Sequence, residues 1–383
     1  MKKKTLTIIA AVIGVIALAY MCLPYYARQA LLHLYPDIDD LHLFARDTVH
    51  APDTCWQWPH AAGYNTYRLD ARDAAYLDSM QTVSFLVISH DSIVYEYYAP
   101  EWCDTVTSNL YSATKTIVGL LAGIALDEGK IGSLDDPVSD YLPGYTGDGR
   151  DSVTVRDLLT MSAAIDWDES YASLLSVTTH AYYGDDLRDL VTSLGVVGET
   201  GVQYSYRSGE TQLLAFVVEA AMGETLSSLA ERKLWRPMGA ERDAYWLLDS
   251  PGGDEKAFCC FHTTARDAAR FGRLMLRHGD WDGRRLVSRR YMDEAMSPAS
   301  HLKDQWGSGQ LDYYGFQTWV MHYRGMVCPY MRGMLGQYVI TIPRRDAIVV
   351  RLGHKWSRDY VRELTTDIIR YMDIACGILD ACQ

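Results

Sequence analysis

The stretch LYSATKTIVGLLAGIAL, residues 110–126, places small polar residues in front of a long apolar run. The apolar positions recur at helical spacing, so the stretch predicts a helix that opens near Ser112 and ends by Gly129. Lys115 follows Ser112 by three residues, which places both side chains on one helix face. A serine at a helix N-terminus lies at the positive end of the helix dipole, and a lysine among apolar neighbours loses basicity through desolvation. Such a lysine accepts a serine proton, so the pattern favours a nucleophilic serine.

The Ser-x-x-Lys spacing is weak evidence by itself. It recurs at Ser300 and Lys303, in a polar stretch after Pro298 with no apolar helix behind it. The alternative for Ser112 is therefore an ordinary helix-start serine beside a solvated lysine, and the surrounding sequence has to decide.

Several further blocks follow residues 110–115 in a fixed order. They are GKI at 129–131, LDDPV at 134–138, YLP at 141–143, VTVRDLLTMS at 153–162, and Cys259-Cys260 followed by TARDAARFG at 264–272. Together they resemble the serine β-lactamase and penicillin-binding-protein superfamily, most closely its class C-related branch with family VIII carboxylesterases and 6-aminohexanoate-oligomer hydrolases. The resemblance covers about residues 80–375 and implies that Ser112 is the nucleophile and Lys115 its proton partner.

The order of elements predicts the fold class. Residues 83–88 and 93–98 are typical of a β-hairpin, and four short strands are expected between 314 and 352, before a helix over 359–374. A long helical stretch lies between these two groups. We expect an α+β fold, β-lactamase/transpeptidase-like, with an antiparallel sheet built from both ends of the chain. The expected hydrolase domain is 76–383, with an α/β part at about 76–115 and 310–383 and a helical part at about 116–309.

The second catalytic element implied by the resemblance is a tyrosine. The family pattern is Tyr-x-Asn, or Tyr-x-Ser in the esterase and oligomer-hydrolase branch. Tyr206-Arg207-Ser208, just before an apolar helix, fits this pattern, so Tyr206 is the expected catalytic tyrosine and Ser208 a substrate-binding residue. Such a tyrosine serves as general base in acylation and as acid toward the leaving group. Tyr204 is the nearest competitor, and a turn tyrosine in a chain with 27 of them is the plain alternative.

The third family element, Lys-Thr-Gly on a strand beside the serine, is absent. The corresponding region is 331–338, where Arg332 replaces the lost positive charge and Gly333 and Gly336 allow close approach of substrate. By resemblance, a backbone N–H from this strand and that of Ser112 form the oxyanion hole. The missing lysine favours hydrolysis of an ester or simple amide over a β-lactam.

Composition excludes several classes of function. The 383 residues are 48% hydrophobic and 22% charged, which suits a packed globular protein. A net charge of -13 argues against nucleic-acid binding. The 11 histidines show no paired metal spacing, so no metal or cofactor is expected. The eight cysteines form no CxxC pair, and the adjacent Cys259 and Cys260 would bridge only with strain. We expect buried free thiols, because free cysteine is among the most buried residue types, and the alternative for an exported chain is a disulfide between Cys55 and Cys103 or between Cys376 and Cys382.

The N-terminus is typical of an export signal. Lys2, Lys3 and Lys4 precede an apolar run from Leu6 to Leu23. Residues 1–26 are therefore either a cleaved signal peptide or a membrane anchor, spanning with residues 5–24, and the rest of the chain faces outward. Residues 27–75 are mixed and polar and are predicted to be a spacer or wrapping arm.

These observations predict an exported serine hydrolase that acts on a small-molecule ester or amide through an acyl-enzyme. The alternatives are a D-amino-acid peptidase or β-lactamase and, in a different class, a catalytically silent membrane-tethered sensor domain.

Overall fold

The computed structural model describes residues 2–171 and 173–382. A six-stranded sheet, in the order β3-β2-β12-β11-β10-β9, joins the two ends of the chain, and every neighbouring pair is antiparallel. Two strands come from the first quarter of the chain and four from the last. Their bounds are β2 Thr82–Ser89, β3 Ser92–Tyr98, β9 Trp319–Tyr323, β10 Met326–Gly333, β11 Gln337–Ile342 and β12 Ala347–Gly353. The predicted α+β fold is confirmed.

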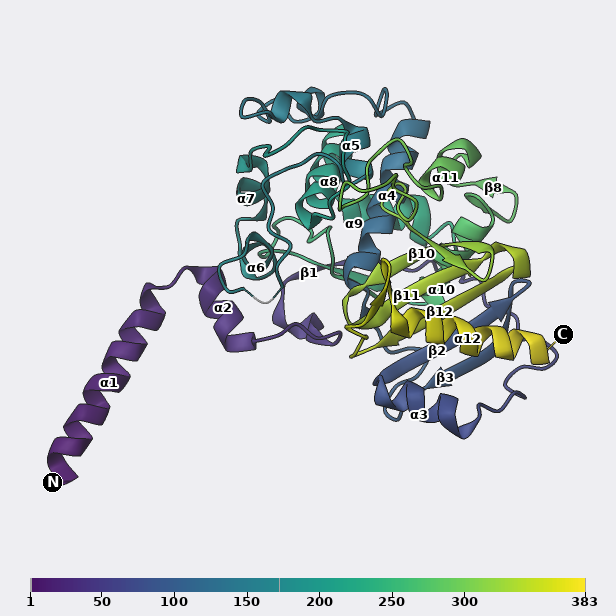
Figure 1. The fold of residues 1–383 in the computed structure, drawn as a ribbon, viewed down its shortest axis with the longest axis horizontal. Helices are drawn as coiled ribbons and strands as arrows, with labels where there is room; N and C mark the ends of the chain where they lie inside the picture. The colour runs from purple at the N-terminus through teal and green to yellow at the C-terminus, as the bar shows by residue number, and fades with distance from the viewer. Residues whose placement is uncertain (1, 172, 383) are drawn as a thin grey trace.

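Both faces of this sheet are covered, and strand periodicity divides the side chains between them. Phe85 and Val87 of β2 pack in a core with α12 (Thr366–Ala381) and α3 (Ala71–Ser79). Leu86 and Ile88 point the other way, into the core shared with α10 (Ala265–Leu276). Figure 1 shows α12 and α3 lying beside the sheet, with the helical part of the chain above it.

The middle of the chain forms the helical part. It contains α4 Thr114–Asp127, α5 Val155–Leu159, α6 Val177–Tyr183, α7 Leu187–Ser193, α8 Ser208–Met222, α9 Leu226–Ala230 and α11 Arg289–Ala295. One continuous hydrophobic core joins these helices to the α10 face of the sheet. The two parts therefore bury their apolar surface together, with α4 between them.

The structure departs from several predicted boundaries. α10 lies within the predicted helical part, yet it packs on the sheet. A small sheet in the order β1-β5-β6-β4 joins two strands from the middle of the chain, β5 and β6, to two strands that precede it, β1 and β4. The helix expected to begin at 359 begins at Thr366 because residues 360–365 form a hairpin. The additional strands are β1 Arg46–Val49, β4 Ser108–Asn109, β5 Ala244–Leu247, β6 Phe261–Thr263, β7 Asp280–Trp281, β8 Arg284–Arg285, β13 Tyr360–Val361 and β14 Leu364–Thr365.

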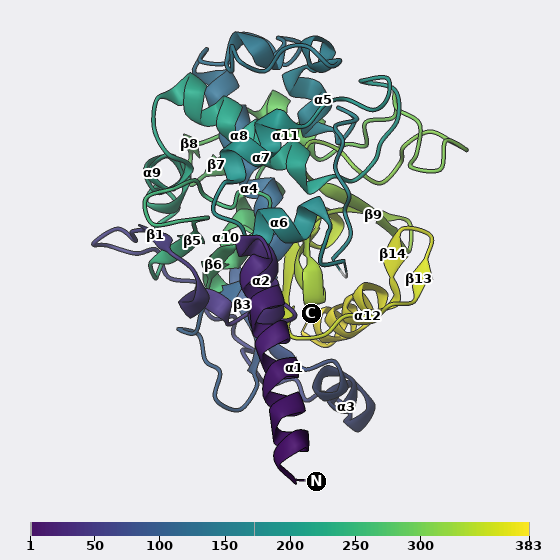
Figure 2. The same ribbon diagram turned by 90° about the vertical axis from the view of Figure 1, so that its left-hand side faces the viewer.

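The N-terminal segment has two unlike pieces. α1 (Lys2–Cys22) projects away from the body in Figure 1 and runs in front of the body, toward the viewer's side, in the turned view of Figure 2. Its stretch Lys4–Cys22 is long and apolar enough to cross a membrane and is not buried. The following residues, 24–44, which we term the N-terminal arm, contain α2 (Tyr25–His33) and lie against the body. Tyr26 of the arm stacks on His180 at 4.2 Å, and the Asn109 N–H donates to the Ile38 carbonyl at 2.9 Å. The arm is thus part of the folded unit.

Candidate active site

Ser112 lies in a single helical turn, Tyr111–Ala113, directly before α4. The chain on its N-terminal side is anchored by two hydrogen bonds: Leu110 N–H donates to the Phe261 carbonyl at 2.9 Å, and Tyr111 N–H donates to the Asn109 side chain at 2.8 Å. The sequence predicted a helix that opens near this serine, and the structure places it there. These hydrogen bonds therefore hold the turn that contains Ser112, which we term the catalytic turn, against strands β4 and β6 of the small sheet.

Lys115 is buried, with only 1% of its surface exposed. Its ammonium donates to Ser112 Oγ at 3.0 Å and to the Phe258 carbonyl at 2.6 Å. Burial lowers the pKa of Lys115 to about 8, and the negative charge of Glu169 opposes that shift. A substantial neutral fraction therefore exists near neutral pH, within reach of the serine proton.

Tyr206 completes the group that the sequence predicted. The Lys115 nitrogen lies 5.1 Å from the centre of the Tyr206 ring, and Tyr206 lines the same cavity as Ser112. Burial, with a smaller contribution from Glu169, raises the pKa of Tyr206 above its usual value. The phenol therefore stays protonated near neutral pH. The competitor, Tyr204, lies in an aromatic cluster with Tyr314, and its hydroxyl has no hydrogen-bond partner among the described residues.

Glu169 is a site residue that the sequence analysis missed. Its carboxylate accepts from the Trp167 indole at 2.7 Å, from Tyr171, and from both the N–H and the hydroxyl of Ser208 at 2.6 Å. These four donors hold a negative charge close enough to influence both Lys115 and Tyr206. The only signal in the sequence was an acidic residue in a loop, and its partner Ser208 is 39 positions away.

Three of the predicted substrate-binding residues, Ser208, Gly333 and Gly336, lie in different environments. Ser208 borders the site, but its hydroxyl is engaged with Glu169. Gly333 lines the cleft, and a Cβ there would lie 2.0 Å from the Leu110 carbonyl oxygen, so only glycine lets β10 approach the catalytic turn this closely. Gly336 lines neither cavity beside Ser112. It instead turns the chain with φ of 81°, next to the Arg351 guanidinium.

Arg332 extends from β10 into the cleft. Its guanidinium donates to the Glu363 carbonyl at 3.0 Å and lies 4.9 Å from the centre of the Trp319 ring, instead of pairing with a carboxylate of any described residue. Cation–π contacts stabilise the charge without neutralising it. The guanidinium is therefore available to a negatively charged or electron-rich group in the cleft.

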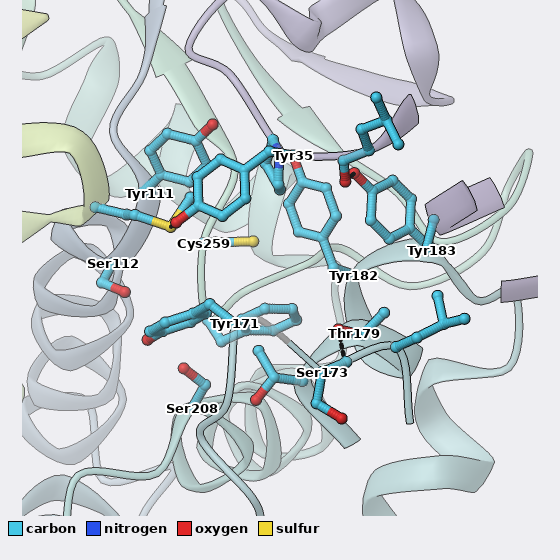
Figure 3. A pocket seen from close by; sticks show the side chains of 17 residues that line it. Tyr35, Tyr111, Ser112, Tyr171, Ser173, Thr179, Tyr182, Tyr183, Ser208 and Cys259 are labelled. Carbon is cyan, nitrogen blue, oxygen red and sulfur yellow. Dashed lines mark hydrogen bonds between the residues drawn. The ribbon is translucent and has the colours of Figure 1, made fainter. Parts of the chain in front are cut away.

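Two cavities meet at Ser112. The first, about 420 Å³, we term the arm cavity, because residues of the N-terminal arm form one wall (Figure 3). The second, about 460 Å³, we term the arginine cavity. Ser112, Tyr171 and Met334 line both. The arginine cavity is otherwise lined by Glu169, Tyr206, Gln305, Trp306, Tyr313, Trp319, Arg332, Gly333, Trp356, Tyr360, Arg362 and Glu363.

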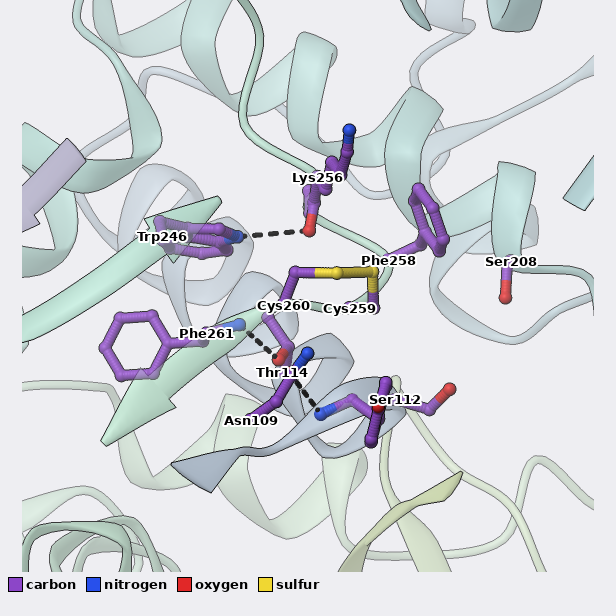
Figure 4. Close-up of a disulfide and its surroundings, with 12 residues drawn as sticks. Asn109, Ser112, Thr114, Ser208, Trp246, Lys256, Phe258, Cys259, Cys260 and Phe261 are labelled. Carbon is purple, nitrogen blue, oxygen red and sulfur yellow. Dashed lines mark hydrogen bonds between the residues drawn. A yellow bond between two sulfur atoms is a disulfide. The ribbon is translucent and has the colours of Figure 1, made fainter. Parts of the chain in front are cut away.

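The adjacent cysteines form a disulfide beside the site, so the expectation of free thiols is wrong for this pair (Figure 4). The backbone of Cys260 adopts φ of 76°, a conformation that sequence reasoning did not anticipate. Cys259 lines the arm cavity, and the preceding Phe258 supplies the carbonyl that Lys115 contacts. Cys55, Cys103, Cys376 and Cys382 are free.

Comparison with known proteins supports the resemblance seen in the sequence. The Beta-lactamase family model matches residues 69–370. The 6-aminohexanoate-dimer hydrolase of Paenarthrobacter ureafaciens is 30% identical over 295 residues, which are 72% of this chain and 73% of that protein.

Solved structures share the fold. A Bacillus anthracis protein provisionally assigned as a 6-aminohexanoate-dimer hydrolase has a TM-score of 0.74 at 19% identity, covering 93% of this chain and 96% of that one. A family VIII carboxylesterase has a TM-score of 0.64 at 18% identity, covering 84% of this chain and 99% of that one. The chain therefore belongs to the beta-lactamase family of serine hydrolases.

Proposed function

We propose that the protein cleaves a small ester or amide through an acyl-enzyme on Ser112. The observation that carries the proposal is the contact of 3.0 Å between the Ser112 hydroxyl and a buried lysine whose pKa is lowered to about 8. Neutral Lys115 takes the serine proton as Ser112 Oγ attacks the substrate carbonyl. The protonated Tyr206 donates its proton to the leaving oxygen or nitrogen and recovers one from Lys115. Water then attacks the acyl-enzyme and releases the acid.

The oxyanion formed in this attack needs two hydrogen-bond donors. We propose the backbone N–H groups of Ser112 and Met334. Met334 directly follows Gly333 at the end of β10 and lines both cavities, as Ser112 does. The close packing of Gly333 on the Leu110 carbonyl keeps the strand and the catalytic turn in register.

A fluorophosphonate probe tests the nucleophile. The wild-type chain should be labelled and should hydrolyse p-nitrophenyl acetate, and Ser112→Ala should lose both. Ser300→Ala is the matched control, because Ser300 has the same Ser-x-x-Lys spacing but lies exposed and remote from both cavities. A folded wild-type protein with neither labelling nor turnover would favour a silent binding domain.

The choice between ester or amide and β-lactam rests on the absent Lys-Thr-Gly. Nitrocefin should be hydrolysed far more slowly than p-nitrophenyl acetate. Efficient nitrocefin turnover, or release of D-alanine from a D-alanyl-D-alanine peptide, would instead support the β-lactamase or peptidase alternatives.

We further propose that the catalytic domain faces outward from the cytoplasm, with α1 as signal sequence or anchor. Three lysines precede an apolar helix that the body does not bury, and lysines remain on the cytoplasmic side. Cell fractionation with mass spectrometry of the N-terminus tests this. An intact chain in the membrane fraction indicates an anchor, a shortened chain a cleaved signal, and an intact chain in the cytosol contradicts export.

A further inference from the structure

One wall of the arm cavity comes from residues outside the family match. Ala30, Leu34, Tyr35 and Pro36 form this wall, whereas the match begins at residue 69. Two contacts fix the wall to the catalytic domain: the Tyr183 hydroxyl donates to the Leu34 carbonyl at 3.2 Å, and Asp37 pairs with His354 at 2.6 Å. The N-terminal arm is thus held in place beside Ser112.

The lining of the arm cavity is uncharged. It consists of aliphatic, aromatic and sulfur-containing side chains together with the hydroxyl groups of five tyrosines and of five serines or threonines, and no charged residue takes part (Figure 3). The members other than the four from the arm are Tyr111, Ser112, Tyr171, Ser173, Leu174, Thr178, Thr179, Tyr182, Tyr183, Ser208, Phe258, Cys259 and Met334. The arginine cavity, in contrast, contains two arginines and two glutamates. Transfer of an apolar group from water into the arm cavity is therefore favourable, whereas transfer of a charged group into it is unfavourable.

The position of Tyr206 decides which half of a substrate enters which cavity. Tyr206 lines the arginine cavity and is not part of the arm cavity. A general acid must lie within hydrogen-bond reach of the atom that it protonates, so the leaving group has to extend toward the arginine cavity. The acyl group, on the other side of the carbonyl carbon, then extends toward the arm.

We propose that the arm cavity binds an apolar acyl chain, so that the preferred substrates are esters or amides of aliphatic acids several carbons long. This inference rests on the proposed hydrolase function and adds its acyl specificity. A cavity of about 420 Å³ lies within the range of small-molecule sites. The N-terminal arm acts as the specificity-determining wall.

The test compares p-nitrophenyl acetate, butyrate and hexanoate with the full-length chain reconstituted in lipid nanodiscs. All three esters share one leaving group, so only the acyl side varies. We expect kcat/KM to rise by roughly threefold for each added methylene, as expected for burial of a CH₂ group. A matched series of ethyl, butyl and hexyl acetates, which lengthens the leaving group by the same number of carbons, should show a smaller gain.

Two pairs of variants locate the effect. Leu174→Trp fills the arm cavity and should lower the hexanoate-to-acetate ratio at least tenfold, whereas Leu175→Trp, at a neighbouring side chain that is 82% exposed, should keep the ratio. Leu34→Asp places a charge in the wall and should also lower the ratio. Its control on the same arm is Leu32→Asp, because the two leucines are similarly exposed, at 74% for Leu34 and 64% for Leu32, and only Leu34 lines the cavity.

The outcomes separate this inference from the proposed function. A flat acyl series with intact fluorophosphonate labelling of Ser112 would overturn the inference and leave the hydrolase standing. A ratio that falls equally in both members of each pair would also overturn it, since the effect would then be a general one on folding. Absence of labelling and of all ester hydrolysis in the wild type would contradict both the proposed hydrolase function and the inference about its acyl specificity.

Discussion

The two cavities at Ser112 differ in both chemistry and origin. The arm cavity is uncharged and takes one wall from residues 30–36, whereas the arginine cavity is aromatic and charged and comes entirely from residues within the family match. In the proposed mechanism, Lys115 and Tyr206 act on a bond held at the junction of the two cavities. The difference teaches that one nucleophile can be given two independent selectivities, provided that each cavity receives a different side of the scissile bond. The following predictions test this division, from the largest effect to the smallest.

The largest effect is expected from the removal of Lys115, because the proposed mechanism uses this base for every substrate. Lys115→Met should lower kcat/KM about 10³-fold or more for every ester, whatever its acyl chain, because it removes the proposed base. In the wild type, kcat/KM should rise as the pH increases through about 8 and then level off, since the neutral amine is the active form. Lys303→Met, at the second Ser-x-x-Lys match, is the control. A loss confined to long acyl chains would contradict a shared base.

Tyr206→Phe should affect substrates according to how strongly their leaving group needs a proton. We expect a loss of about 10²-fold for an alkyl ester and a smaller one for a p-nitrophenyl ester, because nitrophenolate needs little protonation to depart. Tyr204→Phe is the control, since the Tyr204 hydroxyl has no hydrogen-bond partner among the described residues. Equal losses with both leaving groups would argue against Tyr206 as the general acid, and with it against the assignment of the acyl side.

Arg332→Ala should raise KM about tenfold for an ester with a carboxylate on its leaving group, and less for a neutral one, because a charge-assisted contact is lost. Arg332→Lys should restore part of the binding. Arg362→Ala is the matched control within the same cavity, since Arg362 already pairs with Asp312 at 2.8 Å. An effect that ignores the charge of the leaving group would point to a packing role for Arg332 on Trp319.

Glu169→Gln should shift the pH dependence of kcat/KM and leave the value of kcat/KM at high pH nearly unchanged. The carboxylate raises the pKa of Lys115 against the larger effect of burial, so its removal lowers that pKa further below about 8. The rising limb of kcat/KM should therefore shift to lower pH. Asp168→Asn, at the exposed neighbouring acid, should leave the limb in place. A limb that does not move would assign the titration to another group.

Features that depend on residues close together in the sequence could be predicted, whereas features that depend on residues far apart in the sequence could not. Ser112 and Lys115 are three positions apart at the start of one helical segment, so their spacing together with the neighbouring motifs predicted that they meet. The strands of the sheet carry apolar patterns that predicted their existence, whereas their register was seen only in the structure. Glu169 was missed because a loop carboxylate has no periodic signal, and its donors Trp167 and Ser208 meet only after the helical part has folded.

By itself, the sequence determined the fold class and the family and singled out Ser112 and Lys115 as the proposed nucleophile and base, because helix periodicity and local motif order encode these features directly. The tertiary structure decided what surrounds that serine. Tyr35 contacts Met334 across 299 positions and Lys115 contacts the Phe258 carbonyl across 143. Contacts of such separation depend on how the whole core packs, so the two cavities, the position of Glu169 and the role of the N-terminal arm emerge only when the chain is folded.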